Sequence, residues 1–199
     1  MTDKNILIDI PMPITTPRLI LRPAMPGDGK ALHEAKAETY EMLALWMPWA
    51  KPDASLEDDE AVVRDAYAKF IRREDMMLIG FSRLNGEFVV ATGLHRFDWS
   101  IRRFEIGYWT RARYQNQGYV TEAANALTRY AFGALKANAV DIQHAEGNEI
   151  SARVPKKLGF EYESAMRFGT VLPDGTPVTK HTYIRTNIDN LPELDVTWS

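Results

Sequence analysis

The sequence predicts one α/β (α+β) domain, with helices on both faces of a mixed, mostly antiparallel sheet of seven strands. Strand-like and helical segments alternate along the chain, and three strands follow one another in the middle. Asn85-Gly86 and Asp174-Gly175 are hairpin-type turns, which favour antiparallel neighbours. The 199 residues are enough for one core, and no internal repeat divides them.

The ends of the chain are expected to lie outside this domain. Residues 1–16 are predicted as an irregular lead-in, because they combine prolines with no clear periodicity. Residues 187–199 form a polar tail that we expect on the surface. The domain itself is therefore predicted to span 17–186.

Composition and periodicity predict the elements of the domain. Strands are expected, in chain order, at 18–24, 76–84, 87–97, 102–110, 139–145, 160–168 and 181–187. Helices are expected at 26–39, 55–74, 119–136 and 151–159. Ser55 is the expected N-cap of the second helix, whose first turns are acidic. The aromatic, proline-rich segment 44–54 is not expected to be regular.

Charge and composition exclude several classes of protein. The net charge of −3 disfavours binding to nucleic acid, which needs a basic face. The chain has no cysteine, and its four histidines have no ligand-type spacing, so no metal site is expected. Neither a signal peptide nor a run long enough to span a membrane is present, which predicts a cytoplasmic protein without membrane contact. Whether it is a monomer or a homodimer is left open.

A glycine stands directly before the third predicted helix, in the segment YQNQGYVTEA. Backbone N–H groups at a helix start have no partner within the helix and carry partial positive charge. Gly118 would let an anion such as a pyrophosphate approach them closely. Alternatively, Gly118 serves only a tight turn into the helix. The segment NEISARVPKKLGF is a second marker, with Asn148 as N-cap and Gly159 at the helix end.

Four segments in this order resemble the GNAT superfamily of acetyl-CoA-dependent N-acetyltransferases. Within it they are similar to the RimJ/RimL branch, whose characterised members acetylate protein N-terminal amines. The segments are TPRLILRP (16–23), LALWMPWA (43–50), EIGYW with YQNQGYVTEA (105–123) and NEISARVPKKLGF (148–160). The resemblance covers roughly residues 17–186.

The resemblance implies where acetyl-CoA would bind. The strand holding Tyr108, Trp109 and Thr110 would bond the pantetheine arm, and segment 139–145 would splay away from it. The residues implied around the pyrophosphate are Gln115, Asn116, Gln117, Gly118, Tyr119 and Val120. Asn148 would bond a pantetheine amide, and Arg153 or Lys156 would approach the nucleotide.

The chain departs from the family pattern at three positions. The branch usually has glycine at position 116 and alanine or glycine at 120, where this chain has Asn116 and Val120. Many members carry a tyrosine as general acid at position 155, which is Pro155 here. Pro155 also removes a helix hydrogen bond, which should free the carbonyl of Ser151.

The chemistry needs a base for the amine and a donor for the departing thiolate. Glu105, on the face of its strand that also holds Gly107, is the candidate base, directly or through water. Its alternative is a structural ion pair with Arg83, Arg102 or Arg103. Ser151 is the candidate donor, on the basis of the resemblance, and its alternative is a helix-start hydroxyl.

Three more residues are candidates for the acceptor pocket. Trp46 and Trp49 would wall it, or else pack their loop on the core. His144 would face it, or else serve the strand alone. The acceptor is expected to be a protein or peptide N-terminal amine, of the ribosomal-protein type. The alternatives are a small-molecule amine (an amino acid, polyamine or antibiotic) or an acyl-CoA-binding module with weak catalysis.

Overall fold

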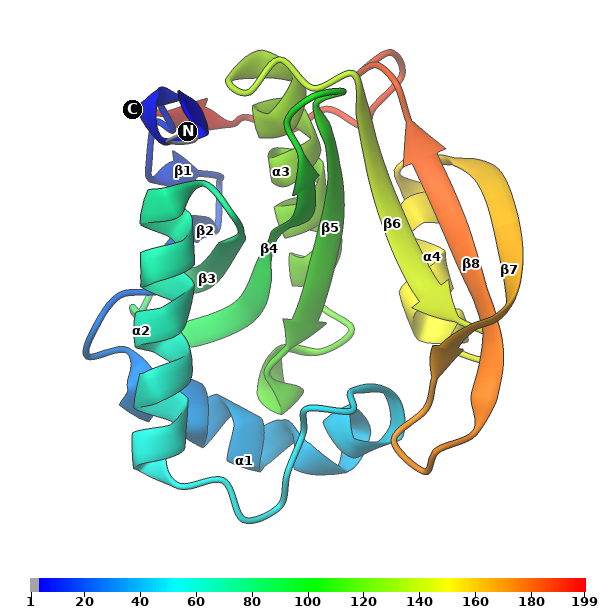
Figure 1. Cartoon of the computed structure of the whole chain (residues 1–199). Coiled ribbons are helices and arrows are strands. Elements are labelled where there is room, and N and C mark those ends of the chain that lie inside the picture. Colours follow the sequence, from blue (N-terminus) through cyan, green and yellow to red (C-terminus); the bar gives the residue numbers. More distant parts are fainter. Residues whose placement is uncertain (1–3) are drawn as a thin grey trace.

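The computed structural model describes residues 4–199 as a single sheet with helices packed on both faces (Figure 1). The helices are α1 (Gly29–Trp46), α2 (Leu56–Arg72), α3 (Tyr119–Gly133) and α4 (Glu149–Lys157), with short 3₁₀ turns η1 (Lys4–Leu7) and η2 (Ala112–Tyr114). The strands are β1 (Ile14–Thr15), β2 (Leu19–Pro23), β3 (Met76–Ser82), β4 (Phe88–Asp98), β5 (Arg103–Thr110), β6 (Ala139–Ala145), β7 (Glu161–Val171), β8 (Pro177–Arg185) and β9 (Thr197–Trp198).

The sheet has the order β7-β8-β6-β5-β4-β3-β2-β1-β9. Every neighbouring pair is antiparallel except β5 and β6, which are parallel. Alternating residues of the strands supply two separate cores. Leu127 and Tyr130 of α3 belong to the core on one face, and Leu43 of α1 and Val63 of α2 belong to the core on the other. The expected mixed sheet with helices on both faces is confirmed.

The start of α2 confirms the predicted cap. The Ser55 hydroxyl accepts the Asp58 N–H at 3.1 Å, while the Asp58 carboxylate accepts the Ser55 N–H at 2.9 Å. These reciprocal bonds form a capping box and satisfy donors that a helix start leaves free.

Helix α1 is longer than predicted and includes Trp46, which was expected in an irregular loop. Leu32, Ala35, Thr39 and Leu43 keep the helical spacing and are all buried against the sheet. The helix ends at Trp46, because its C-cap residue Met47 has an extended backbone (φ −114°, ψ 104°), as the following Pro48 favours. Trp46 is therefore held by the last turn of α1 and not by a loop.

The described residues form nine strands, where seven were expected, because both ends of the chain add a short strand. Ile14 in β1 pairs with Trp198 in β9. At these positions the chain is therefore neither an irregular lead-in nor a surface tail, as had been predicted. Ile14 is fully buried. The Trp198 ring packs edge-on against Tyr130, with centroids 5.6 Å apart. A Cβ atom on Gly133 would lie 2.8 Å from this ring, so the glycine makes room for it.

The two parallel strands separate after a short paired stretch. Three residue pairs join β5 to β6, the last of them Glu105 and Asp141. Beyond this pair β6 runs away from β5 toward α4 (Figure 1), and its other edge stays paired with β8. The expected splay is confirmed, and it leaves a gap in the middle of the sheet.

Candidate active site

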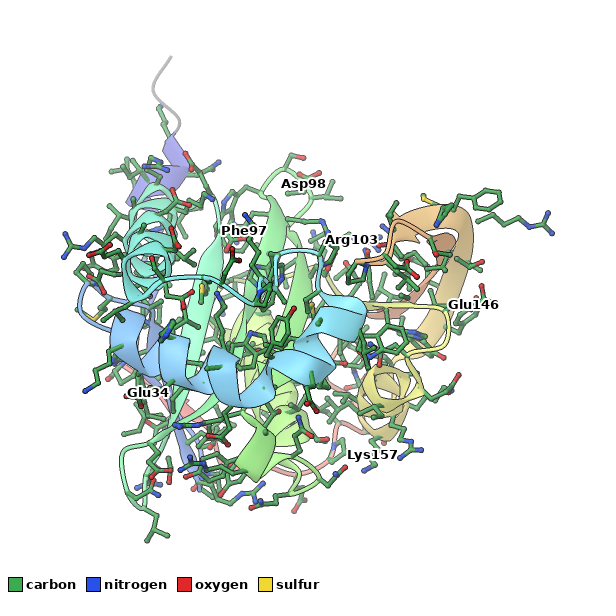
Figure 2. The ribbon with its side chains drawn as sticks, turned by 90° about the horizontal axis from the view of Figure 1, so that it is seen from below. Glu34, Phe97, Asp98, Arg103, Glu146 and Lys157 are labelled. Carbon is green, nitrogen blue, oxygen red and sulfur yellow. The ribbon has the colours of Figure 1, made fainter. Side chains whose placement is uncertain are left out.

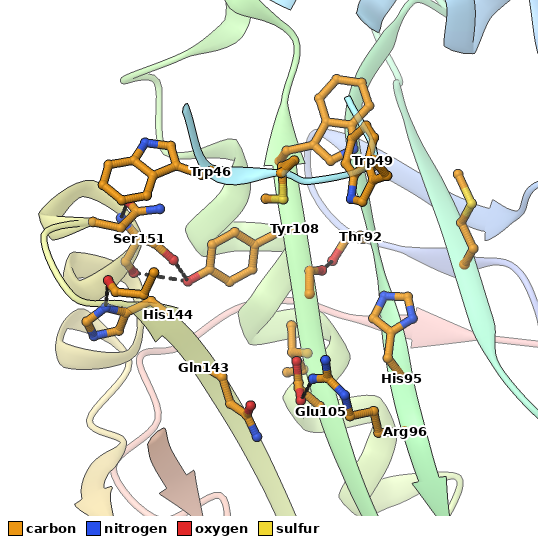
Figure 3. Close-up of a pocket in the computed structure, with 18 of the residues that line it drawn as sticks. Trp46, Trp49, Thr92, His95, Arg96, Glu105, Tyr108, Gln143, His144 and Ser151 are labelled. Carbon is orange, nitrogen blue, oxygen red and sulfur yellow. Dashed lines mark hydrogen bonds and ion pairs between the residues drawn. The ribbon is translucent and has the colours of Figure 1, made fainter. Parts of the chain in front are cut away.

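A cavity of about 720 Å³ occupies the gap between β5 and β6 (Figure 3). It is lined by Tyr108, whose neighbours belong to the α3 core, and by Trp109, which belongs to the α1–α2 core. Helix α1 crosses the ends of the central strands and closes one side (Figure 2). The cavity therefore extends from the α1–α2 face of the sheet to the start of α4, where Asn148 and Ser151 line it.

The segment before α3 forms an open helix start at the end of β5. Gly118 is the N-cap residue in the left-handed region (φ +80°), and no side chain caps this helix. Asn116 is also left-handed (φ +58°), a conformation that asparagine tolerates better than most residues. Asn116 can therefore stand where the family usually has glycine. Gln115, Gln117, Tyr119 and Val120 surround this turn, and the Gln117 amide donates to the Arg113 carbonyl at 2.8 Å.

Arg18 reaches this turn from the strand side, which the sequence did not indicate. Its guanidinium donates to the Gln117 carbonyl at 3.0 Å and lies 4.2 Å from the centre of the Tyr119 ring. It also forms an ion pair of 2.5 Å with Glu122, a buried carboxylate in the first turn of α3. This pair brings a positive group next to the N–H groups of the helix start.

At the start of α4, Tyr108 and Ser151 meet. The Tyr108 hydroxyl donates to the Ser151 carbonyl at 3.0 Å and lies 3.3 Å from the Ser151 hydroxyl. In an unbroken helix this carbonyl would accept the N–H of residue 155, but Pro155 has none. The predicted free carbonyl is thus present, and a tyrosine from β5 bonds it. Burial raises the pKa of the Tyr108 hydroxyl well above its ordinary value.

Asn148 caps α4 as predicted, because its side-chain oxygen accepts the Ser151 N–H at 3.1 Å. Its amide nitrogen is the group with which it would donate to a ligand. Arg153 and Lys156 lie on the exposed side of the same helix. Thr110, at the end of β5, is buried and paired in register with Val90 of β4.

Glu105 lines the cavity and forms an ion pair with Arg96 (Figure 3). Its side chain is 14% exposed. Arg96 lies at an irregularity of β4, with φ +48°, which turns its side chain back over β5. The arginines suggested as partners bond elsewhere, so those suggestions are wrong: Arg83 to the Thr16 carbonyl, Arg102 to the Leu135 carbonyl and Arg103 to Asp141 and Glu163.

The aromatic residues suggested for the acceptor pocket do line the cavity. Trp46 and Trp49 extend from the end of α1 and the loop after it. The Trp49 ring lies 6.4 Å from that of Trp109, and the residue is still 46% exposed. Trp49 is thus partly packed and partly free to contact a ligand.

His144 lines the cavity from β6. Its Nδ1 donates to the Ala145 carbonyl at 2.9 Å, and its ring stacks on His181 with centroids 5.1 Å apart. Its Nε2 is buried and has no protein hydrogen-bond partner in the described structure. Burial lowers the pKa of His144 below its ordinary value, so the neutral ring offers Nε2 as an acceptor.

Sequence reasoning missed a second histidine in the cavity. Asp75 and His95 both line it, and the Asp75 carboxylate accepts from His95 Nδ1 at 2.8 and 3.0 Å. Twenty positions separate them, and they meet only because β3 and β4 pair with Met76 opposite Leu94. No local sequence signal could have shown this contact.

Two features are absent from residues 4–199, the part of the chain that the structure describes. No group of three or more histidine, aspartate or glutamate side chains is arranged to hold a metal ion. No helix in this range combines the length and the apolar character needed to cross a membrane.

Comparison with known proteins identifies relatives of this chain. The family model "Acetyltransferase (GNAT) domain" matches residues 18–161. "Putative ribosomal N-acetyltransferase YdaF" of Bacillus subtilis (strain 168) is 30% identical over 154 residues, which cover 76% of this chain and 82% of that protein. "Uncharacterized N-acetyltransferase YnaD" of the same organism is 30% identical over 175 residues, covering 82% of this chain and 90% of that protein.

Solved structures share the fold. RimL, a ribosomal L7/L12 alpha-N-protein acetyltransferase solved with coenzyme A, superimposes with a TM-score of 0.81 at 20% identity, over 88% of this chain and 97% of that one. MccE, an immunity acetyltransferase solved with acetyl-CoA and AMP, gives 0.79 at 17% identity, over 86% and 93%. Together with the splayed strands and the open start of α3, the family match leads to one conclusion: the chain belongs to the GNAT acetyltransferase family and is an N-acetyltransferase.

Proposed function

We propose that this enzyme transfers the acetyl group of acetyl-CoA to the N-terminal amine of a protein or peptide, of the ribosomal-protein type. The observation that carries the proposal is the cavity that joins the α1–α2 face of the sheet to the start of α4 beside the splayed strands. A thioester that enters along β5 from the side of α3 and α4 meets an amine that enters past Trp46 and Trp49. Two substrates on opposite faces can react in the gap without competing for one entrance.

Acetyl-CoA is proposed to bind along the free edge of β5. Beyond Glu105 this edge has no pairing with β6, so backbone groups near Tyr108, Trp109 and Thr110 are available to the pantetheine arm. The Asn148 amide would donate to a pantetheine carbonyl. The turn from Gln115 to Val120 would hold the pyrophosphate on backbone N–H groups, with Arg18 beside it. Arg153 and Lys156 are exposed cations that would approach the nucleotide.

The chemistry is proposed to involve Glu105 and Ser151. The amine arrives as an ammonium ion, and the Glu105 carboxylate would accept a proton from it, directly or through water. Backbone N–H groups of β5 would stabilise the thioester oxygen as it gains charge. The Ser151 hydroxyl, 3.3 Å from the Tyr108 hydroxyl, would donate to the departing thiolate. Glu105 and Ser151 lie on opposite sides of β5, so one can act on the amine and the other on the sulfur (Figure 3).

The proposed acceptor side offers an exposed aromatic surface to a protein or peptide N-terminus. Trp49 is 46% exposed at this entrance and offers its ring to a side chain next to the reacting amine. The name of YdaF, a ribosomal N-acetyltransferase, supports the same acceptor class.

The test is the release of CoA thiol from acetyl-CoA with a panel of amines. The panel contains peptides copied from ribosomal-protein N-termini, the same peptides with a blocked N-terminus, free amino acids, polyamines and aminoglycosides. We expect release with the unblocked peptides, and mass spectrometry should place one acetyl group on the α-amine. Faster release with a small amine would show that the acceptor is a small molecule and not a protein or peptide N-terminus. Tight binding of acetyl-CoA without release with any amine would favour a binding module.

A further inference from the structure

The acceptor nitrogen must lose two protons during the proposed reaction. It enters as R–NH₃⁺ and leaves as the amide R–NH–CO–CH₃, while the N–C bond forms and the C–S bond breaks. In the net reaction one of these protons is released to solvent, and the other is balanced by the proton that the CoA thiolate takes up with Ser151 as donor. Glu105 is the proposed acceptor of one proton. The cavity contains a second group that can take the other.

We infer that the Asp75–His95 pair is this second proton acceptor, a catalytic pair beside Glu105. The inference rests on the proposed transfer to an amine and deepens it. His95 and Glu105 face each other across β4 and β5 in register, so their side chains project from the same face of the sheet. Both line the same cavity (Figure 3). A nitrogen within reach of one is therefore close to the other.

The hydrogen bond to Asp75 prepares His95 for this role. A carboxylate can only accept, so the proton lies on Nδ1 when the ring is neutral, and Nε2 carries the lone pair. When Nε2 takes a proton, the imidazolium is stabilised by the adjacent carboxylate. The pair is neither fully buried nor fully exposed, with side chains 31% and 28% accessible. The ring can thus exchange its proton with water after each turnover.

Two glycines create the space for the ring. Gly93 and Gly107 are opposite each other in the register of β4 and β5. A Cβ atom on Gly107 would lie 2.9 Å from His95 Cδ2 and 3.1 Å from Nε2, and one on Gly93 would lie 3.0 Å from Nε2. The ring therefore lies over the strand segment that follows Glu105, where β5 leaves β6. This position is the part of β5 along which the thioester is proposed to lie.

Glu105 alone is poorly placed to take both protons, since its carboxylate is already ion paired with Arg96. His95 is paired with a carboxylate instead, that of Asp75. The two neighbouring pairs thus differ in their geometry: Arg96 contacts the carboxylate of Glu105, whereas Asp75 contacts only the Nδ1 side of the His95 ring and leaves Nε2 for the substrate.

The experiment measures CoA thiol release by His95→Ala, with the primary amine of the panel that wild-type enzyme turns over fastest. We expect turnover to fall by roughly 10²- to 10⁴-fold with little change in acetyl-CoA affinity. Free imidazole should restore part of the rate in proportion to its concentration, because the space above Gly93 and Gly107 can admit it. Asp75→Asn should lower turnover as well, and imidazole should not restore it, since the His95 ring still fills that space.

His33→Ala is the matched control. His33 forms the same kind of pair with Asp59, at 2.9 Å, but does not line the cavity. It should keep wild-type turnover and show no response to imidazole. If His95→Ala behaves like His33→Ala, or loses rate that imidazole does not restore while Tm and acetyl-CoA affinity are unchanged, the inference is wrong. Should His95→Ala fail to fold, His95→Gln, which can keep a bond to Asp75, is judged by its turnover at unchanged Tm.

The acceptor class and the pair can fail separately. If the fastest amine is a small molecule, the proposed peptide acceptor is wrong, while the effect of His95→Ala on that amine still decides the role of the pair.

Discussion

Helices α3 and α4 both begin next to the gap in the sheet, and they begin in opposite ways. Helix α3 starts on Gly118, with no side chain bonded to its first N–H groups. Helix α4 starts on Asn148, whose own side chain accepts the Ser151 N–H. An uncapped start can give its hydrogen bonds to a ligand, whereas a capped start has already used one of them. The difference supports the proposal that phosphate binds at α3 and that α4 serves the reacting end of the cofactor.

The largest effect is expected from Gly118→Val. A β-branched residue at φ +80° is strained, and its Cβ would lie 3.6 Å from the Arg18 guanidinium beside the turn. Losing one or two hydrogen bonds to a charged group, each worth ~1.5 to 3 kcal/mol, should weaken CoA binding by roughly 10- to 10⁴-fold. Titration calorimetry with CoA measures this.

Gly86→Val is the control for backbone strain, since Gly86 has φ +73° in a hairpin turn with nothing near its Cβ position. It should lower Tm but not CoA affinity. Pantetheine without phosphates should stabilise the wild-type enzyme much less than CoA does. Equal effects of CoA and pantetheine on Tm would mean that α3 holds no phosphate.

Ser151→Ala tests whether α4 takes part in the chemistry. A donor to the thiolate contributes on the order of one charged hydrogen bond, so turnover should fall roughly 10- to 100-fold with acetyl-CoA affinity nearly preserved. Pro155→Tyr in the Ser151→Ala background should restore part of the rate if the usual family geometry survives. Full turnover of Ser151→Ala would leave Ser151 with a structural role, and water as the donor.

A smaller effect separates the two functions of Asn148. Asn148→Asp keeps an oxygen that caps α4 but loses the amide donor, so Tm should stay near wild type while KM for acetyl-CoA rises several-fold. Asn148→Ala loses both, and its free energy of unfolding should fall by about 1 kcal/mol. Identical KM values for wild type and Asn148→Asp would show that Asn148 only caps the helix.

The smallest effect concerns how the start of α3 is anchored. Glu38 of α1 bonds Arg113 and Arg111 around η2, and these contacts lower the pKa of its carboxyl from 4.5 to about 2. A lowered pKa in the folded state adds stability above pH 4.5, which is lost as the pH falls toward 2. Glu38→Gln should therefore have a lower Tm than wild type at pH 7, and this difference should shrink between pH 4.5 and 2. A constant difference across this range would exclude the charge as its cause.

Parts of the site that are built from consecutive residues could be predicted from the sequence, and parts that depend on strand register could not. The turn around Gly118 is built from consecutive residues, so its chemistry is written in one short segment. The Asp75–His95 and Arg96–Glu105 pairs depend on strand register and on an irregularity in β4, which no local pattern encodes. Helix α1 was predicted too short because its aromatic end suggested a loop, although Leu43 continued the buried face. The two-residue strands β1 and β9 are too short for any periodicity to show.

The brief pairing of β5 with β6 also bears on how a cofactor enters. In a fully paired sheet, an inserted ligand would have to break ladder hydrogen bonds, each worth about 0.5 to 1.5 kcal/mol net, before it made any of its own. Here the ladder ends at Glu105 and Asp141, so the strand edge is exposed before the cofactor arrives. Each hydrogen bond between this edge and the cofactor therefore replaces only a hydrogen bond to water, and not a bond within the sheet. The free energy needed to keep these two strands apart is therefore part of the stability of the folded protein, and it does not reduce the affinity for the cofactor.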